Sequence, residues 1–188
     1  TPLQLQGATT KLRAQLRDDQ PPEPNFVELL GRIGDDADGQ RIRRWLSHPN
    51  DGIKRAAARA WARSDRPLGP LGERADDPVI QPIFIEAAKD RGNKSTTLRT
   101  LVQHRPAEEE SIEPWRLAVI AVAGRVSPSA VLDAYDVLVQ QGATAQLRRQ
   151  VLTAALEPLL VDPAGLNEQI TIALVDLLLT RAEVFIEL

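Results

Sequence analysis

Apolar residues recur at helical spacing from one end of the chain to the other, whereas the alternating runs typical of β-strands are scarce. The pattern therefore predicts an all-helical protein. Proline, glycine and small polar residues interrupt it at short intervals and mark helix ends. On this basis the sequence predicts ten short helices, at about residues 4–18, 24–34, 38–47, 51–64, 78–89, 95–104, 112–125, 128–141, 144–160 and 166–182.

Some helix boundaries carry local signals. Asp51 precedes the alanine run as a candidate N-cap, and Ser127 precedes Pro128, which is favourable at the first helical position. The proline-rich segment 20–24 predicts a stiff connector, because each ring removes a backbone donor. The tandem Pro-Leu-Gly sequence at residues 67–72 predicts an exposed loop with no helix.

The chain also shows internal repetition. The sequence that begins at Asp36 aligns with the sequence that begins at Asp77, an offset of 41 residues. An interval of about 40 to 47 residues is typical of repeats of two antiparallel helices, each of which buries its apolar face by stacking on its neighbours. The sequence therefore predicts a series of helix pairs.

Two segments carry a more specific resemblance. They are Leu-Leu-Gly-Arg-Ile-Gly-Asp at 29–35 and His-Pro-Asn-Asp-Gly-Ile-Lys-Arg-Ala-Ala-Ala-Arg-Ala-Trp at 48–61. With the short helix between them, they resemble HEAT repeats, particularly the short bacterial type related to PBS lyases. In that pattern Asn50 stands at the position of a turn aspartate, and Lys54 or Arg55 stands at a basic position. The resemblance covers about residues 24–104, and only helix-pair periodicity supports it over 105–188.

This resemblance implies a fold and a class of function. The implied fold is a right-handed α-solenoid, a superhelix of about five antiparallel helix pairs that forms one domain over residues 1–188, with less regular pairs over 105–188. The second helix of each pair would line a concave surface. Families of this kind mostly bind proteins, sometimes bind nucleic acid and rarely catalyse a reaction.

The distribution of charge points to one part of the chain. The 188 residues carry a formal charge of −3, but residues 1–105 carry +4 and residues 106–188 carry −7. Arg55, Arg59 and Arg63 recur at every fourth position of the predicted helix 51–64 and form one positive stripe. Like charges at this spacing repel one another, so we expect an anionic neighbour.

The stripe has two interpretations. In the first, it contacts an acidic protein, a phosphate group or a nucleic-acid backbone, and the predicted partner-binding residues are Arg44, Lys54, Arg55, Arg59 and Arg63. In the second, the basic residues pair within the protein with carboxylates of adjacent repeats, such as Asp35, Asp36, Asp38, Asp76 and Asp77. Nucleic acid is disfavoured by a sequence pI near 5.5 and by the scarcity of aromatic residues.

Candidate catalytic chemistry is sparse. The chain has no cysteine, and His48 and His104 do not have the spacing of metal ligands. The acidic segment 35–39 lacks the first and last ligands of an EF-hand loop and is better explained as a helix start. Nucleophile-elbow and phosphate-loop motifs are absent. We therefore predict no catalytic residue, no metal and no cofactor.

The C-terminal segment predicts a second contact surface. Residues 170–188 place apolar side chains on all sides of the predicted last helix, and such a helix is normally buried. We expect a hydrophobic contact there, made by residues 181–188 folding back, by a partner subunit, through self-association or by chain beyond these 188 residues, and involving Leu178, Val184, Phe185 and Ile186. The longest unbroken apolar stretch, 117–123, is shorter than the roughly 18 to 20 residues of a membrane span.

The leading functional hypothesis is a non-enzymatic scaffold or adaptor for protein–protein interaction. The alternatives are a HEAT-like nucleic-acid-binding protein or DNA glycosylase, in which Trp45, Trp61 and Trp115 would contact DNA, and a subunit of the chromophore-lyase type. Trp61 stands where the repeat pattern has a core leucine, which favours ordinary packing. A third hypothesis is a structural segment of a larger multidomain protein. No feature of the sequence indicates a cellular compartment.

Overall fold

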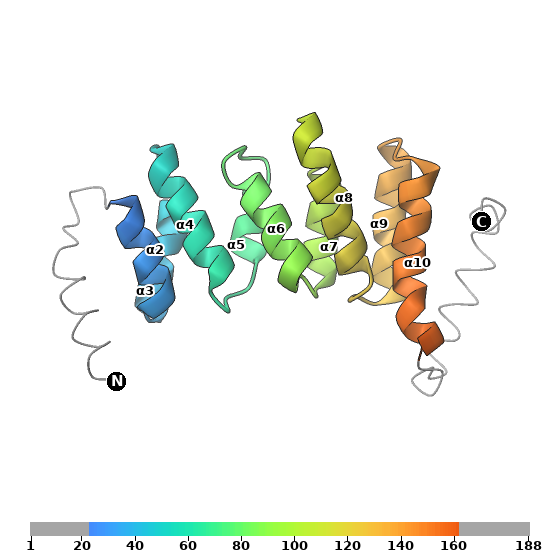
Figure 1. The fold of residues 1–188 in the computed structure, drawn as a ribbon, viewed down its shortest axis with the longest axis horizontal. Helices are drawn as coiled ribbons and strands as arrows, with labels where there is room; N and C mark the ends of the chain where they lie inside the picture. Colours follow the sequence, from blue (N-terminus) through green and yellow to red (C-terminus); the bar gives the residue numbers. More distant parts are fainter. Residues whose placement is uncertain (1–22, 162–188) are drawn as a thin grey trace. The chain divides into compact units, whose positions relative to one another are not determined.

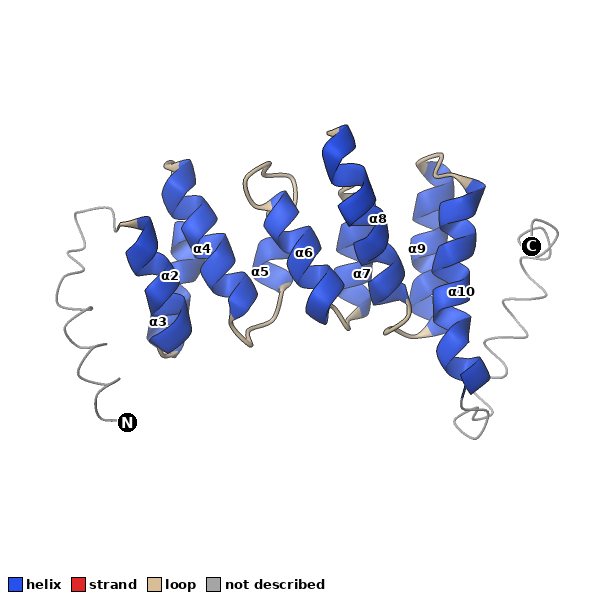
Figure 2. Cartoon of the chain, in the orientation of Figure 1, coloured by secondary structure: helices blue, strands red, loops and turns tan. Residues whose placement is uncertain are grey.

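The computed structural model describes residues 23–161, and these residues form helices joined by turns, with no strand among them (Figure 1, Figure 2). The all-helical prediction is confirmed over this range. The helices are α2 (Pro24–Ile33), α3 (Asp36–Trp45), α4 (Asp51–Arg63), α5 (Gly69–Gly72), α6 (Gln81–Arg91), α7 (Ser95–Gln103), α8 (Glu109–Ala123), α9 (Pro128–Gln140) and α10 (Ala145–Val161). None of these described helices has the length and apolar character needed to cross a membrane.

Some of the predicted elements lie outside the described residues. These are the helices predicted at 4–18 and 166–182 and the C-terminal contact residues Leu178, Val184, Phe185 and Ile186. Within the described range, the predicted and observed helices differ mainly at their starts. Helix α6 begins at Gln81 and α8 begins at Glu109, each three residues from its predicted start.

The Pro-Leu-Gly segment differs from its prediction. Residues Gly69–Gly72 form one helical turn, α5, in place of an exposed loop. Leu68 and Leu71 are both buried, so their apolar side chains hold the segment against the protein. Proline is tolerated in a first helical turn because its missing N–H would have no partner there.

Short polar side chains cap the starts of α3 and α4. The N-cap of α4 is Asn50, and not Asp51 as predicted, because the Asn50 side-chain oxygen accepts hydrogen bonds from the N–H groups of Gly52 and Ile53. At the start of α3, Asp35 and Asp38 each accept a hydrogen bond from the other's backbone N–H, which is a capping box. The acidic segment 35–39 is therefore the start of a helix, as predicted.

Contacts divide the chain into two compact units, one ending at Ala87 and the other beginning at Ala88, so the boundary lies within α6. In the first unit, α4 packs against both α2 and α3. Pro24 lies near Gly52, while Gly31 lies near Ala60, so α2 and α4 run parallel. One continuous domain over 1–188, with less regular pairs after residue 105, stays a prediction.

Helix α3 runs in the opposite direction to α4. Arg66, just beyond the end of α4, lies against Gly39 near the start of α3. Its guanidinium donates a hydrogen bond to the carbonyl oxygen of Asp35 and lies 5.8 Å from the centre of the Trp61 ring. The segment that follows α4 is therefore hydrogen-bonded to the segment that precedes α3, as expected for antiparallel helices.

The structure corrects the 41-residue alignment. Asp36 begins α3, which is antiparallel to α4, whereas Asp77 lies in the turn before α6 and contacts Lys54 in the first turn of α4. Asp77 therefore lies beside the start of α4. The two aligned segments differ in structure, because Asp36 lies in the first turn of α3 whereas Asp77 lies four residues before α6, whose first turn has no acidic residue.

The second unit contains two further antiparallel pairs. Helix α7 contacts α8 and α9, and α10 contacts α8 and α9. The Trp115 indole, midway along α8, donates to the Leu101 carbonyl late in α7, and the two helices pack against each other across a short connection, so they are antiparallel. The Gln141 amide after α9 donates to the Val102 carbonyl, so α9 and α7 end at the same side and run parallel. Pair α9–α10 thus stacks on pair α7–α8.

Candidate functional site

Helix α4 is amphipathic, with small apolar residues on its inner face. Ile53, Ala56, Ala57, Ala60 and Trp61 are buried. Alanines leave room for a close approach of α2, whose Gly31 lies directly against Ala60. This packing turns the opposite face of α4 towards solvent.

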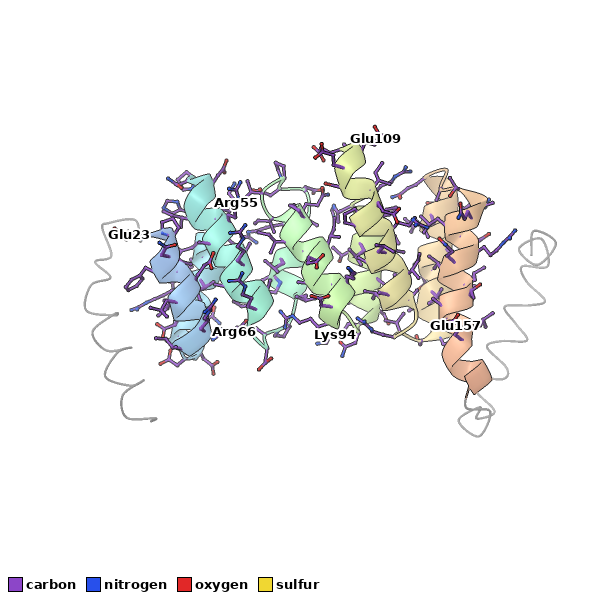
Figure 3. The ribbon with its side chains drawn as sticks, viewed as in Figure 1. Glu23, Arg55, Arg66, Lys94, Glu109 and Glu157 are labelled. Atoms are coloured by element: carbon purple, nitrogen blue, oxygen red, sulfur yellow. The ribbon has the colours of Figure 1, made fainter. Side chains whose placement is uncertain are left out.

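The arginine stripe lies on that solvent-facing side. Arg55, Arg59 and Arg63 are all exposed and follow one another at intervals of one helical turn, as predicted. Figure 3 shows the side chains on α4, with Arg55 labelled. The neighbouring helix α2 supplies a carboxylate that two of these arginines contact.

That carboxylate belongs to Glu28, which was not among the predicted anionic neighbours. Its Oε2 lies 2.9 Å from Arg63 Nη1, and its Oε1 lies 3.7 Å from Arg59 Nη1. One carboxylate of α2 therefore contacts two arginines that are four residues apart on α4. The sequence alone could not predict this contact, because the distance between Glu28 and the arginines depends on the register in which α2 packs parallel to α4.

Two arginines on this face have no ion pair among the described residues. They are Arg55 on α4 and Arg32 in the last turn of α2, and both are exposed. Arg32 follows Glu28 by four residues, so the two lie on the same side of α2. We call Arg32, Arg55, Arg59 and Arg63 the arginine surface, with Glu28 as its internal carboxylate.

Lys54 is not part of this surface. Its Nζ lies 2.8 Å from Asp77 Oδ2 and 3.1 Å from Asp51 Oδ1, and its side chain is only 16% exposed. For Lys54, the interpretation as an internal pair with Asp77 is confirmed.

Arg44 also lies away from the arginine surface. It is exposed on α3, two positions after the buried Ile42. Two residues correspond to about 200° around a helix, so Arg44 lies on the side of α3 away from the core. The structure therefore brings Arg55, Arg59 and Arg63 together but does not place Arg44 beside them.

The tryptophans do not form an exposed aromatic platform in the described structure. Trp61 and Trp115 are buried, and their indole N–H groups donate to the carbonyl oxygens of Pro67 and Leu101 at 2.8 and 2.7 Å. Trp45 is half-buried. Ordinary packing is confirmed for Trp61. In the same described range, no three His, Asp or Glu side chains are grouped in a way that could hold a metal ion.

The Lys54–Asp77 pair shifts the titration of both groups. Burial opposes ionisation of Asp77, but the hydrogen bond from Lys54, the backbone N–H groups of Val79 and Ile80 and the lysine charge outweigh it, so the pKa of Asp77 lies below its usual 3.8. Hydrogen bonds to Asp77 and Asp51 raise the pKa of Lys54 above 10.5. The pair is therefore fully ionised at neutral pH.

We expect this pair to stabilise the protein at neutral pH and to lose its effect in acid. Because the folded-state pKa of Asp77 is depressed, its contribution is present above the unfolded value of 3.8 and disappears as the pH falls through the folded value. Asp77→Asn should therefore lower the urea midpoint at pH 7 and make it less sensitive to pH between 5 and 2. Asp65→Asn, at an exposed carboxylate with no ion pair among the described residues, is the control. Equal pH profiles for the two variants would contradict the assignment.

The sequence was compared with protein-family models, with curated proteins and with solved structures, and no significant match was found in any of the three.

Proposed function

We propose that the chain is a HEAT-like α-solenoid that serves as a non-enzymatic scaffold or adaptor and binds an acidic protein at the arginine surface. The arrangement within each unit supports the fold assignment. In the first unit, α3 lies antiparallel to α4, while α2 and α4 run parallel. In the second unit, α7–α8 is antiparallel and α7 runs parallel to α9. This alternation is expected for stacked helix pairs.

The single observation that carries the function is the excess of positive charge on one exposed face. The arginine surface has four guanidinium groups and one carboxylate; Arg59 and Arg63 contact that carboxylate, whereas Arg32 and Arg55 have no ion pair among the described residues. Internal pairing therefore neutralises only part of the charge. An acidic protein surface complements such a face and is steered towards it by long-range attraction.

Affinity capture with matched charge reversals tests this proposal. Arg55→Glu should remove an acidic protein that the wild-type chain retains from extracts of its native source. Arg44→Glu changes the same charge at another exposed position without an ion pair among the described residues, and it should retain the protein. Because neither arginine contacts a carboxylate of residues 23–161, we expect both variants to keep the wild-type melting temperature.

The outcome separates the two interpretations of the stripe. Retention of the same proteins by both variants would contradict a partner site at the arginine surface. If the material lost from Arg55→Glu is nucleic acid, and its binding weakens steeply with salt, the protein-scaffold proposal is overturned in favour of phosphate binding.

A further inference from the structure

The contact between Glu28 and α4 shows how this face receives a carboxylate. Arg59 and Arg63, one turn apart, both contact the same carboxylate, at 3.7 and 2.9 Å. Arg55 and Arg59 have the same spacing on the same exposed side of α4, and Arg55 has no ion pair among the described residues. Arg55 and Arg59 can therefore contact a carboxylate in the same way as Arg59 and Arg63 contact Glu28.

We propose that the partner is an acidic α-helix that lies along α4 and places a carboxylate between Arg55 and Arg59, as α2 places Glu28 between Arg59 and Arg63. A further carboxylate of that helix contacts Arg63 or Arg32. This inference rests on the proposed function and specifies the chemistry and the spacing of the partner.

A helix and an extended peptide match the arginine spacing almost equally well, and the cost of ordering a flexible peptide favours the helix. Residues four apart on an α-helix are about 6 Å apart along its axis. Carboxylates at every fourth position of a partner helix therefore have the same repeat as the arginines of α4. In an extended strand, residues on one side recur about every 6.6 Å, but a flexible peptide must also be ordered on binding, which costs affinity.

The composition of the surface favours carboxylates over nucleic-acid phosphates. Glu28 lies within the arginine surface, is partly exposed and repels phosphates and carboxylates alike, so the distinction rests on the nucleic-acid bases. Single-stranded nucleic acid also gains much of its affinity by stacking bases on aromatic side chains. Trp61, the tryptophan of α4, is buried and hydrogen-bonded to Pro67, so it offers no stacking surface.

Fluorescence-anisotropy titrations with two synthetic helical peptides test the inference. In the first, glutamates occupy every fourth position, so that they form one row. The second has the same composition, with its glutamates distributed around the helix. We expect the first peptide to bind the full chain about tenfold more tightly, which corresponds to roughly 1.4 kcal/mol. Arg55→Glu should remove this preference, whereas Arg44→Glu should preserve it.

A second variant is expected to raise the affinity for the first peptide, whereas Arg55→Glu lowers it. Glu28→Gln keeps the size of the side chain but removes the carboxylate that contacts Arg59 and Arg63. It should increase the affinity for the first peptide, because two more guanidinium groups become available. A purely structural role of Glu28 would lower the melting temperature without increasing the affinity, and that result overturns the inference.

The remaining outcomes are equally distinct. If the two peptides bind equally well, the spacing inference fails while an acidic partner remains supported. If neither peptide binds at low salt, and captured proteins also do not depend on Arg55, then the proposed function fails as well. If a single-stranded oligonucleotide of equal charge binds more tightly than the first peptide, the carboxylate assignment is overturned.

Discussion

Replacing Trp115 by alanine is expected to lower the free energy of unfolding by about 3–5 kcal/mol, the usual cost of removing a large buried aromatic side chain. Trp115 is only 1% exposed and lies at the contact of α7 and α8. Its indole N–H donates to the Leu101 carbonyl at 2.7 Å, and Arg105 lies 5.7 Å from the ring centre. The variant therefore loses apolar contacts, a hydrogen bond and a cation–π contact together.

Urea denaturation followed by circular dichroism measures this loss. Trp115→Phe separates the terms, because phenylalanine keeps much of the apolar volume but leaves the Leu101 carbonyl without the indole donor, at a cost of about 1–3 kcal/mol. Trp45→Ala is the matched control, since Trp45 is only half-buried and should cost less. Equal losses for Trp115→Ala and Trp45→Ala would show that Trp115 does not hold the helix pair together.

The features that sequence reasoning predicted correctly are set by neighbouring residues. Helix α9 begins at Pro128 after the N-cap Ser127, as expected from local backbone preferences. The four-residue spacing of Arg55, Arg59 and Arg63 likewise places them on one side of α4 whatever the surroundings are. The arginines are exposed because the alanine-rich opposite face of α4 is buried, and that burial depends on packing against other helices.

The features that were missed depend on contacts between distant segments. Helix α5 forms because Leu68 and Leu71 are buried, and their burial outweighs the local signal of proline and glycine. Glu28 belongs to the site only because α2 packs parallel to α4 in one register. Arg44 was grouped with the stripe because it is close in the sequence, but it lies on α3, on the side away from the core.

The register of α2 on α4 also makes Gly31 a determinant of the site. A Cβ atom added at Gly31 would lie 2.5 Å from the Cβ atom of Ala60 and 2.9 Å from its Cα atom. Because the latter atom is backbone, the clash can be relieved only if the two helices move apart. Glu28 lies one turn before Gly31 on α2, so such a movement also draws its carboxylate away from Arg63.

Gly31→Ala is therefore expected to destabilise the protein by about 1–3 kcal/mol, as overpacking of a close contact does. The sign is informative, because helix propensity alone would make alanine better than glycine by about 1 kcal/mol. Gly69→Ala is the control, since nothing lies within 4 Å of a Cβ atom added there. Urea denaturation should show a loss for Gly31→Ala and none for Gly69→Ala. A Gly31→Ala protein as stable as the wild type would mean that α2 and α4 tolerate a wider separation, and that their register does not depend on this glycine.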